Sequence, residues 1–202
     1  MAIRHIVFDI GNVLLNFDPE YAYQDLISDP VERKAFLSDV CSRNWIEAQD
    51  RVHAWAPGEV DLIARYPDQA ALIRSFRERW HYMVPNAIAE SVVILEQLSA
   101  SGGDITALTN FNGETFDEAR ERFDLFKYFR GVTVSGRIGL LKPAPEIFQH
   151  HVAAFDLVPE DVLFIDDVAA NVEAARDGGW QAVQFINPDA LRRDLRSLEV
   201  IV

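Results

Sequence analysis

IRHIVFDIGNVLL, residues 3–15, decides the fold of this 202-residue chain. The residues from Ile3 to Phe8 are mainly apolar, with little polar alternation from Ile6 onward. Such a run predicts a β-strand buried on both faces, as in a parallel sheet covered by helices. The run stops at the carboxylate of Asp9. Ligands of open α/β sheets bind outside the carboxyl ends of the strands, so Asp9 is expected at a binding edge. The alternative is a turn aspartate that ends a core strand.

From Pro85 onward, helices and strands alternate. Four further strands are predicted at residues 105–108, 132–134, 161–165 and 181–186. Between and after them, helices are predicted over 86–100 and 114–129, up to 155, up to 177, and from 189. This alternation predicts an α/β fold, with a doubly wound, parallel, five-stranded Rossmann-like core.

The segment between the first strand and Pro85 has a different hydrophobic pattern. Its periodicity predicts helices only, over residues 20–28, 31–40, 44–54, 59–65 and 68–82. Three of the four tryptophans lie in this block, which therefore has its own apolar centre. We expect a core formed by residues 1–16 and 85–202, with an all-helical insertion at 17–84.

Composition limits the partners of the protein. The net charge is −13, from 32 acidic and 19 basic residues, which disfavours nucleic acid. A single cysteine, Cys41, excludes an intrachain disulfide framework and a thiolate zinc site, and a buried packing role is expected for it. No apolar run approaches the roughly 18 residues of a membrane span, and no signal-peptide pattern precedes the first strand. We expect a cytoplasmic protein with no membrane partner.

Polar residues follow four of the predicted strands: Asp9, Thr109, Lys142, and the pair Asp166 and Asp167. Each alone has a simpler explanation, as a turn, a surface charge or a helix N-terminus. The topology would nevertheless bring them to one edge, where carboxylates about 5 Å apart repel unless a cation lies between them. Oxygen ligands without a His or Cys cluster indicate Mg²⁺, and a hydroxyl with an ammonium suits a phosphate.

Four ordered motifs carry a family resemblance. They are Phe8–Leu14, Leu108–Asn110, the run Ser135–Phe148 around Lys142-Pro143, and Phe164–Asp167 with Asn171 following. In this order the chain resembles the haloacid dehalogenase-like hydrolase superfamily, and the insertion resembles the family's helical cap. The Gly-Asn-Val sequence in the first motif is similar to that of sugar-phosphate phosphatases and of the phosphatase-like domain of epoxide hydrolases.

The resemblance implies a nucleophile and a metal site. Asp9 would attack phosphorus and become an aspartyl-phosphate. Mg²⁺ would be held by the Asp9 carboxylate, the Gly11 carbonyl and Asp166, with Asp167 as a further or water-mediated ligand. The metal would reduce the repulsion between an anionic nucleophile and an anionic phosphate.

The resemblance also implies a phosphate pocket and a substrate class. Thr109 and the Asn110 N–H would hold phosphate oxygens, while Lys142 would pair with Asp9 and the transferring group. Asn12 and Asn110 are the expected substrate-binding residues. A helical roof favours a small phosphorylated metabolite as the partner.

One departure from the family pattern leaves alternatives open. Phosphatases of the superfamily usually carry an acid–base aspartate two residues after the nucleophile, and here that residue is Gly11. Three alternatives follow. The first is a Mg²⁺-dependent phosphatase in which water, the substrate or a cap residue transfers the protons. The others are a metal-independent 2-haloacid dehalogenase and a weakly active binding or regulatory protein.

The cap holds the expected specificity surface, for which the candidates are Trp45, Asp50, Arg51 and Trp55. Cap core and solvated charges are the alternative explanation of these four residues.

Overall fold

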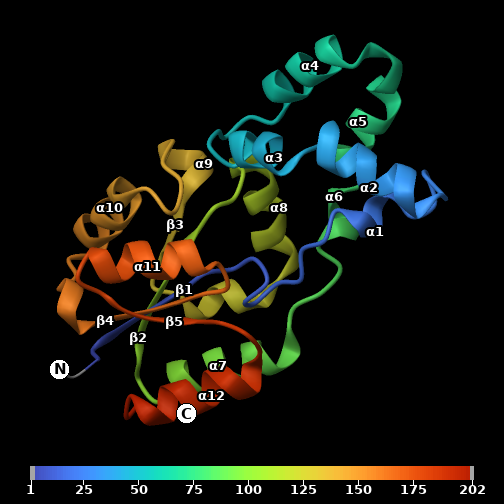
Figure 1. Cartoon of the computed structure of the whole chain (residues 1–202). Helices are drawn as coiled ribbons and strands as arrows, with labels where there is room; N and C mark the ends of the chain where they lie inside the picture. Colours follow the sequence, from blue (N-terminus) through green and yellow to red (C-terminus); the bar gives the residue numbers. More distant parts are fainter. Residues whose placement is uncertain (1–2, 201–202) are drawn as a thin grey trace.

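A computed structural model describes residues 3–200 of the protein, within which five parallel strands form one sheet (Figure 1). The strand order is β3-β2-β1-β4-β5. The strands are β1 (His5–Phe8), β2 (Asp104–Thr109), β3 (Val132–Val134), β4 (Val162–Asp166) and β5 (Gln181–Gln184). This arrangement confirms the predicted α/β fold.

Strand β1 is the centre of the sheet, and all four of its residues are buried. Phe8, its last residue, is in register with Ala107 of β2 and with Ile165 of β4. The residues that follow these positions therefore reach the same carboxyl edge. That register is why Asp9 and Asp166 become neighbours although 157 residues separate them.

Alternate residues of β1 face two layers of helices. Ile6 and Phe8 belong to an apolar cluster with α7 (Ala89–Ala100) and α12 (Pro188–Ser197). Val7 belongs to a second cluster, with α10 (Pro145–Phe155) and α11 (Ala169–Asp177). The two pairs of helices lie on opposite faces of the sheet (Figure 1). Both faces are thus covered, as the apolar run in β1 predicts.

The predicted insertion forms a set of short helices around an apolar cluster of its own. This cluster includes Tyr23, Phe36, Trp45, Trp55 and Phe76, together with the buried Cys41. The helices are α1 (Glu20–Tyr23), α2 (Pro30–Asp39), α3 (Arg43–Gln49), α4 (Ala56–Arg65), α5 (Ala70–Glu78) and α6 (Trp80–Met83). They form a group outside the sheet and the helices that cover its two faces (Figure 1). We propose them as the cap, with the boundaries 17–84.

Several predicted helices were too long. The helix expected over 44–54 ends at Gln49, because the carbonyls of Val52 and His53 instead accept hydrogen bonds from the core segment at 113–114. The helix expected over 68–82 is interrupted at Arg79, and the one expected over 20–28 ends at Tyr23.

The core shows two further differences. The helix expected over 114–129 is α8 (Gly113–Arg122), which ends where Phe123 becomes extended and precedes a 3₁₀ turn, Asp124–Tyr128. A short helix, α9 (Ser135–Ile138), was not predicted. No helix in residues 3–200 has the length and apolar character needed to cross a bilayer.

Candidate active site

The carboxyl edge of the sheet holds a buried ammonium between two carboxylates. Lys142 Nζ lies 2.9 Å from Asp9 Oδ1 and 2.7 Å from Asp166 Oδ2, and it also donates to the Leu108 carbonyl at 2.9 Å. The Lys142 side chain is 1% exposed. Nζ thus donates hydrogen bonds to Leu108 and Asp166 and forms an ion pair with Asp9, so this lysine contributes its charge to the site.

The protonation of this cluster follows from burial and charge. Burial raises the pKa of Asp9, and the charge of Asp166 adds to this, while Lys142 opposes both. Burial opposes the charged form of Lys142, but Asp166 and Asp9 raise its pKa above the usual range. Burial, then the charge of Asp166, raises the pKa of the half-buried Asp167. Three carboxylates thus share one permanent ammonium, which favours a further cation.

The donor set fits a hard divalent cation. Asp9, Asp166 and Asp167 each offer a carboxylate oxygen, and these oxygens lie within 4.8 Å of one another. No histidine or cysteine takes part in this group. All-oxygen carboxylate ligands are the set that Mg²⁺ prefers. The residues predicted as metal ligands from the sequence are therefore brought together, and Gly11 lines the same cavity.

Two asparagines hold the charged residues in place. Asn171 Nδ2 lies 3.0 Å from both carboxylate oxygens of Asp166, which also accepts the Val168 N–H at 2.8 Å. The Asn110 side chain donates to the Lys142 carbonyl at 2.9 Å and accepts its N–H at 2.8 Å. The sequence predicts Asn110 as a substrate-binding residue and does not predict these two hydrogen bonds to the Lys142 backbone. The spacing of Asn171 after the acidic pair was the only signal for its role.

The other two predicted residues have different environments. Asn12 adopts the left-handed conformation, with φ of 53°, and its Oδ1 accepts the Phe17 N–H at 3.0 Å. Its side chain therefore closes its own loop, while the residue also lines the cavity. Thr109 is buried at the tip of β2, and within residues 3–200 the lining includes its neighbour Asn110 but not Thr109.

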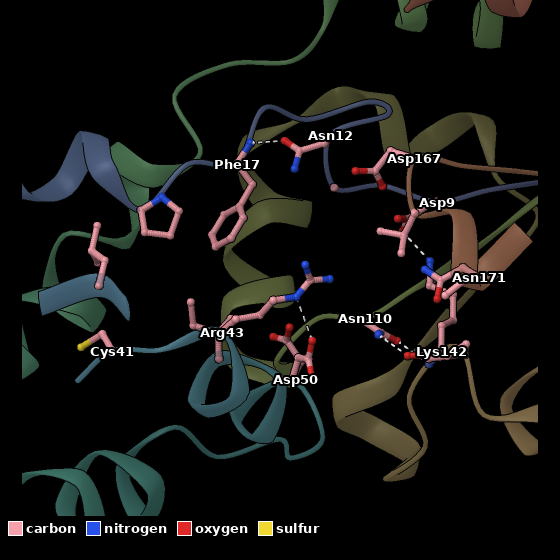
Figure 2. Close-up of a pocket in the computed structure, with 18 of the residues that line it drawn as sticks. Asp9, Asn12, Phe17, Cys41, Arg43, Asp50, Asn110, Lys142, Asp167 and Asn171 are labelled. Atoms are coloured by element: carbon pink, nitrogen blue, oxygen red, sulfur yellow. Dashed lines mark hydrogen bonds and ion pairs between the residues drawn. The ribbon is translucent and has the colours of Figure 1, made fainter. Parts of the chain in front are cut away.

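A cavity of about 660 Å³ opens between this cluster and the proposed cap. Asp9, Asp167 and Lys142 lie on one side, and Arg43 and Asp50 lie on the side that faces them (Figure 2). Apolar cap residues complete the wall, among them Phe17, Pro19, Leu37, Cys41 and Ile46. Among the described residues, the lining contains no histidine.

The cap side of the cavity is hydrogen-bonded to the core. Asn112 Nδ2 donates to the carbonyls of Gln49 and Val52, at 3.0 and 2.8 Å, and Asn112 N–H donates to Asp50 Oδ1 at 3.0 Å. Ser135 Oγ donates to the Asp50 carbonyl at 2.6 Å. The segment 49–53, which we call the docking segment, is thereby fixed against the core.

A solved structure shares this fold. A haloacid dehalogenase family enzyme from Bacteroides thetaiotaomicron, in complex with magnesium and inorganic phosphate, superposes with a TM-score of 0.70 and 21% sequence identity. The match covers 91% of this chain and 94% of that one.

Two characterised relatives are similar in sequence. A sesquiterpene phosphatase from Aspergillus oryzae is 25% identical, over 95% of this chain and 94% of the relative. A drimenol cyclase from Aspergillus calidoustus is also 25% identical, over 97% of this chain, but the chain spans only 36% of that longer protein. The family model of haloacid dehalogenase-like hydrolases matches residues 3–179. The chain belongs to this hydrolase family.

Proposed function

We propose that this hydrolase is a Mg²⁺-dependent phosphatase that acts on a small phosphorylated metabolite through an aspartyl-phosphate at Asp9. The cluster of Asp9, Asp166 and Asp167 around Lys142 is the observation that carries the proposal. A site that used Asp9 without a metal would gain little from two further carboxylates. The three neighbouring carboxylates therefore favour phosphate over halide chemistry.

The residues have distinct roles in the proposed reaction. Asp9 Oδ1 accepts the Ile10 N–H at 2.7 Å and forms an ion pair with the Lys142 ammonium, whereas Oδ2 has no partner among the described residues. The carboxylate is thus oriented with one oxygen available. Asp9, the Gly11 carbonyl, Asp166 and Asp167 would hold Mg²⁺, whose charge would reduce the repulsion between Asp9 and the phosphate.

Other residues would orient the phosphate and exclude water. Lys142 offsets part of the carboxylate charge, and the Asn110 side chain holds the backbone of Lys142 in position. The Asn110 N–H and the Thr109 hydroxyl are the proposed contacts of phosphate oxygens. The apolar wall and the cavity of about 660 Å³ suit a small substrate. Because one fungal relative is named a sesquiterpene phosphatase, the test panel should include an apolar phosphate.

The test is phosphate release from a panel of small phosphomonoesters with Mg²⁺ and with chelator, with 2-chloropropionate run in parallel. We expect metal-dependent release that Asp9→Asn reduces on the order of 10³-fold or more. Glu47→Gln removes a carboxylate from the same cavity and serves as the control. Chloride release that is indifferent to chelator, or undiminished hydrolysis by folded Asp9→Asn, would refute the proposal.

A further inference from the structure

Asp50 is a carboxylate in the active cavity for which the reaction above has no role. The inference drawn from it rests on the proposed phosphatase function. An alkyl phosphate must lose its alcohol, and the departing oxygen needs a proton. Gly11 has no side chain to supply one, and a positioned acid typically contributes 10²–10⁴-fold.

The carboxyl group of Asp50 is held firmly on one side only. Oδ1 accepts the Asn112 N–H at 3.0 Å, and the Asp50 carbonyl accepts the Ser135 hydroxyl at 2.6 Å. Oδ2 has no hydrogen-bond partner within residues 3–200. One oxygen therefore fixes the group while the other can carry a proton.

The position of Asp50 matches the direction in which the leaving group must depart. In phosphoryl transfer the attacking and leaving oxygens lie roughly in line through phosphorus. With Asp9 as the nucleophile, the leaving oxygen is on the opposite side of the phosphoryl group, toward the cap. Asp50 is the C-cap residue of α3 and lies across the cavity from Asp9 (Figure 2).

Gly11 and Asp50 share the same open space. Both line the main cavity and also a smaller cavity of about 90 Å³ that adjoins it. A Cβ built on Gly11 would have nothing within 4 Å. The site therefore lacks a side chain beside the nucleophile and has a carboxyl group facing that space from the cap.

The charges around Asp50 suit an acid at neutral pH. Asp9, Asp167 and Lys142 face it from the core, and Arg43 and Glu47 belong to its own helix. Burial raises the pKa of Asp50 to about 7, against the Asn112 N–H, and the charges of Glu47 and Asp9 add to the rise. Arg43 pairs with Glu47 at 3.0 Å rather than with Asp50.

We propose that Asp50 is the general acid and base of this enzyme. As the Asp9 oxygen bonds to phosphorus and the ester P–O bond breaks, the Asp50 proton passes to the leaving oxygen, which departs as an alcohol. Asp50, now a carboxylate, then takes a proton from the water that attacks phosphorus. The bond from phosphorus to Asp9 breaks, and phosphate, the Asp9 carboxylate and protonated Asp50 result.

The test is Asp50→Asn, assayed on p-nitrophenyl phosphate and on glycerol 2-phosphate with saturating Mg²⁺. The amide keeps an oxygen to accept the Asn112 N–H but cannot donate a carboxyl proton. We expect kcat/KM to fall about 10²–10⁴-fold on the alkyl ester and less than about 10-fold on the nitrophenyl ester, whose leaving group needs no proton. Asp61→Asn, the same substitution at an exposed position of α4 outside the cavity lining, is the matched control and should leave the ratio of the two activities unchanged.

The outcomes distinguish the role of Asp50 from the proposed phosphatase function. Equal losses on both substrates, with the wild type active, would overturn the role of Asp50 and leave the phosphatase intact. A wild type inactive on every phosphate would overturn both. Should Asp50→Asn fail to fold, the wild-type pH profiles decide: an alkaline loss of kcat on the alkyl ester alone supports the role, and identical profiles refute it.

Discussion

His151 should make the folded protein sensitive to acid. It is fully buried beneath the sheet, where Nε2 lies 2.8 Å from Thr106 Oγ1 and Nδ1 lies 2.8 Å from Thr133 Oγ1. Thr106 Oγ1 also lies 2.8 Å from Nε2 of His5, whose Nδ1 contacts Asp104. Neutral rings satisfy every member of this chain of hydrogen bonds. A charged His151 would be desolvated with no carboxylate beside it.

The magnitude follows from the pKa of His151. Burial lowers this pKa from 6.5 to about 3, with smaller contributions from neighbouring positive charges. Between these two values the unfolded chain binds a proton that the native protein does not, so stability falls as the pH falls through that interval. Each unit is worth about 1.4 kcal/mol, so between pH 7.5 and 4.5 His151 should remove about 2.7 kcal/mol of unfolding free energy.

The assay is urea unfolding of the wild type and His151→Gln between pH 7.5 and 4.5. Asp9 and Asp50 act in the opposite direction, because their raised pKa values favour the native state on acidification, but they are present in both proteins and cancel. We expect the stability advantage of the wild type to shrink by about 2.7 kcal/mol. A difference that stays constant within about 0.5 kcal/mol would refute the reasoning. His150→Gln, at the exposed neighbouring position, reports the effect of the substitution itself.

Three further predictions concern the site. Lys142→Met should lower the unfolding free energy in chelator by about 3–5 kcal/mol, because it leaves two buried carboxylates without their ammonium, and added Mg²⁺ should restore part of the loss in a urea titration. Asn112→Ala should cost about 2–3 kcal/mol and speed hydrogen exchange in the docking segment, whereas unchanged exchange would contradict its anchoring role. Gly11→Asp should fold normally and restore turnover of alkyl phosphates to Asp50→Asn, as measured by phosphate release.

The fold was predictable because its signals are local. Buried strands read as apolar runs, and the first helices after them carry their periodicity in the sequence. The carboxyl edge followed from topology alone, which is why Asp9, Lys142 and Asp166 could be placed together before any distance was known. Helix ends were less predictable, since α3 stops where the carbonyls of Gln49, Val52 and His53 accept hydrogen bonds from a segment more than sixty residues away.

The polar network beneath the sheet could not be predicted at all. His5, Thr106, Thr133 and His151 lie in β1, β2, β3 and α10, and no spacing in the sequence links them. The two hydrogen bonds between the Asn110 side-chain amide and the Lys142 backbone were equally unpredictable, because the two residues are 32 positions apart. Residue types indicate that a polar group needs a partner, but only the packed structure selects which one.

The docking segment shows how a cap residue can belong to the catalytic apparatus. A Cβ on Gly136 would lie 2.6 Å from the Val52 carbonyl, so only glycine permits this approach of core and cap. Gly113 N–H and Glu114 N–H donate to Val52 and to His53 in the same contact. Asp50 is thus positioned both by core loops and by its own helix, α3, whose last turn accepts the Asp50 N–H. An acid held from both sides is preorganised, and preorganised geometry is what proton transfer to a leaving group requires.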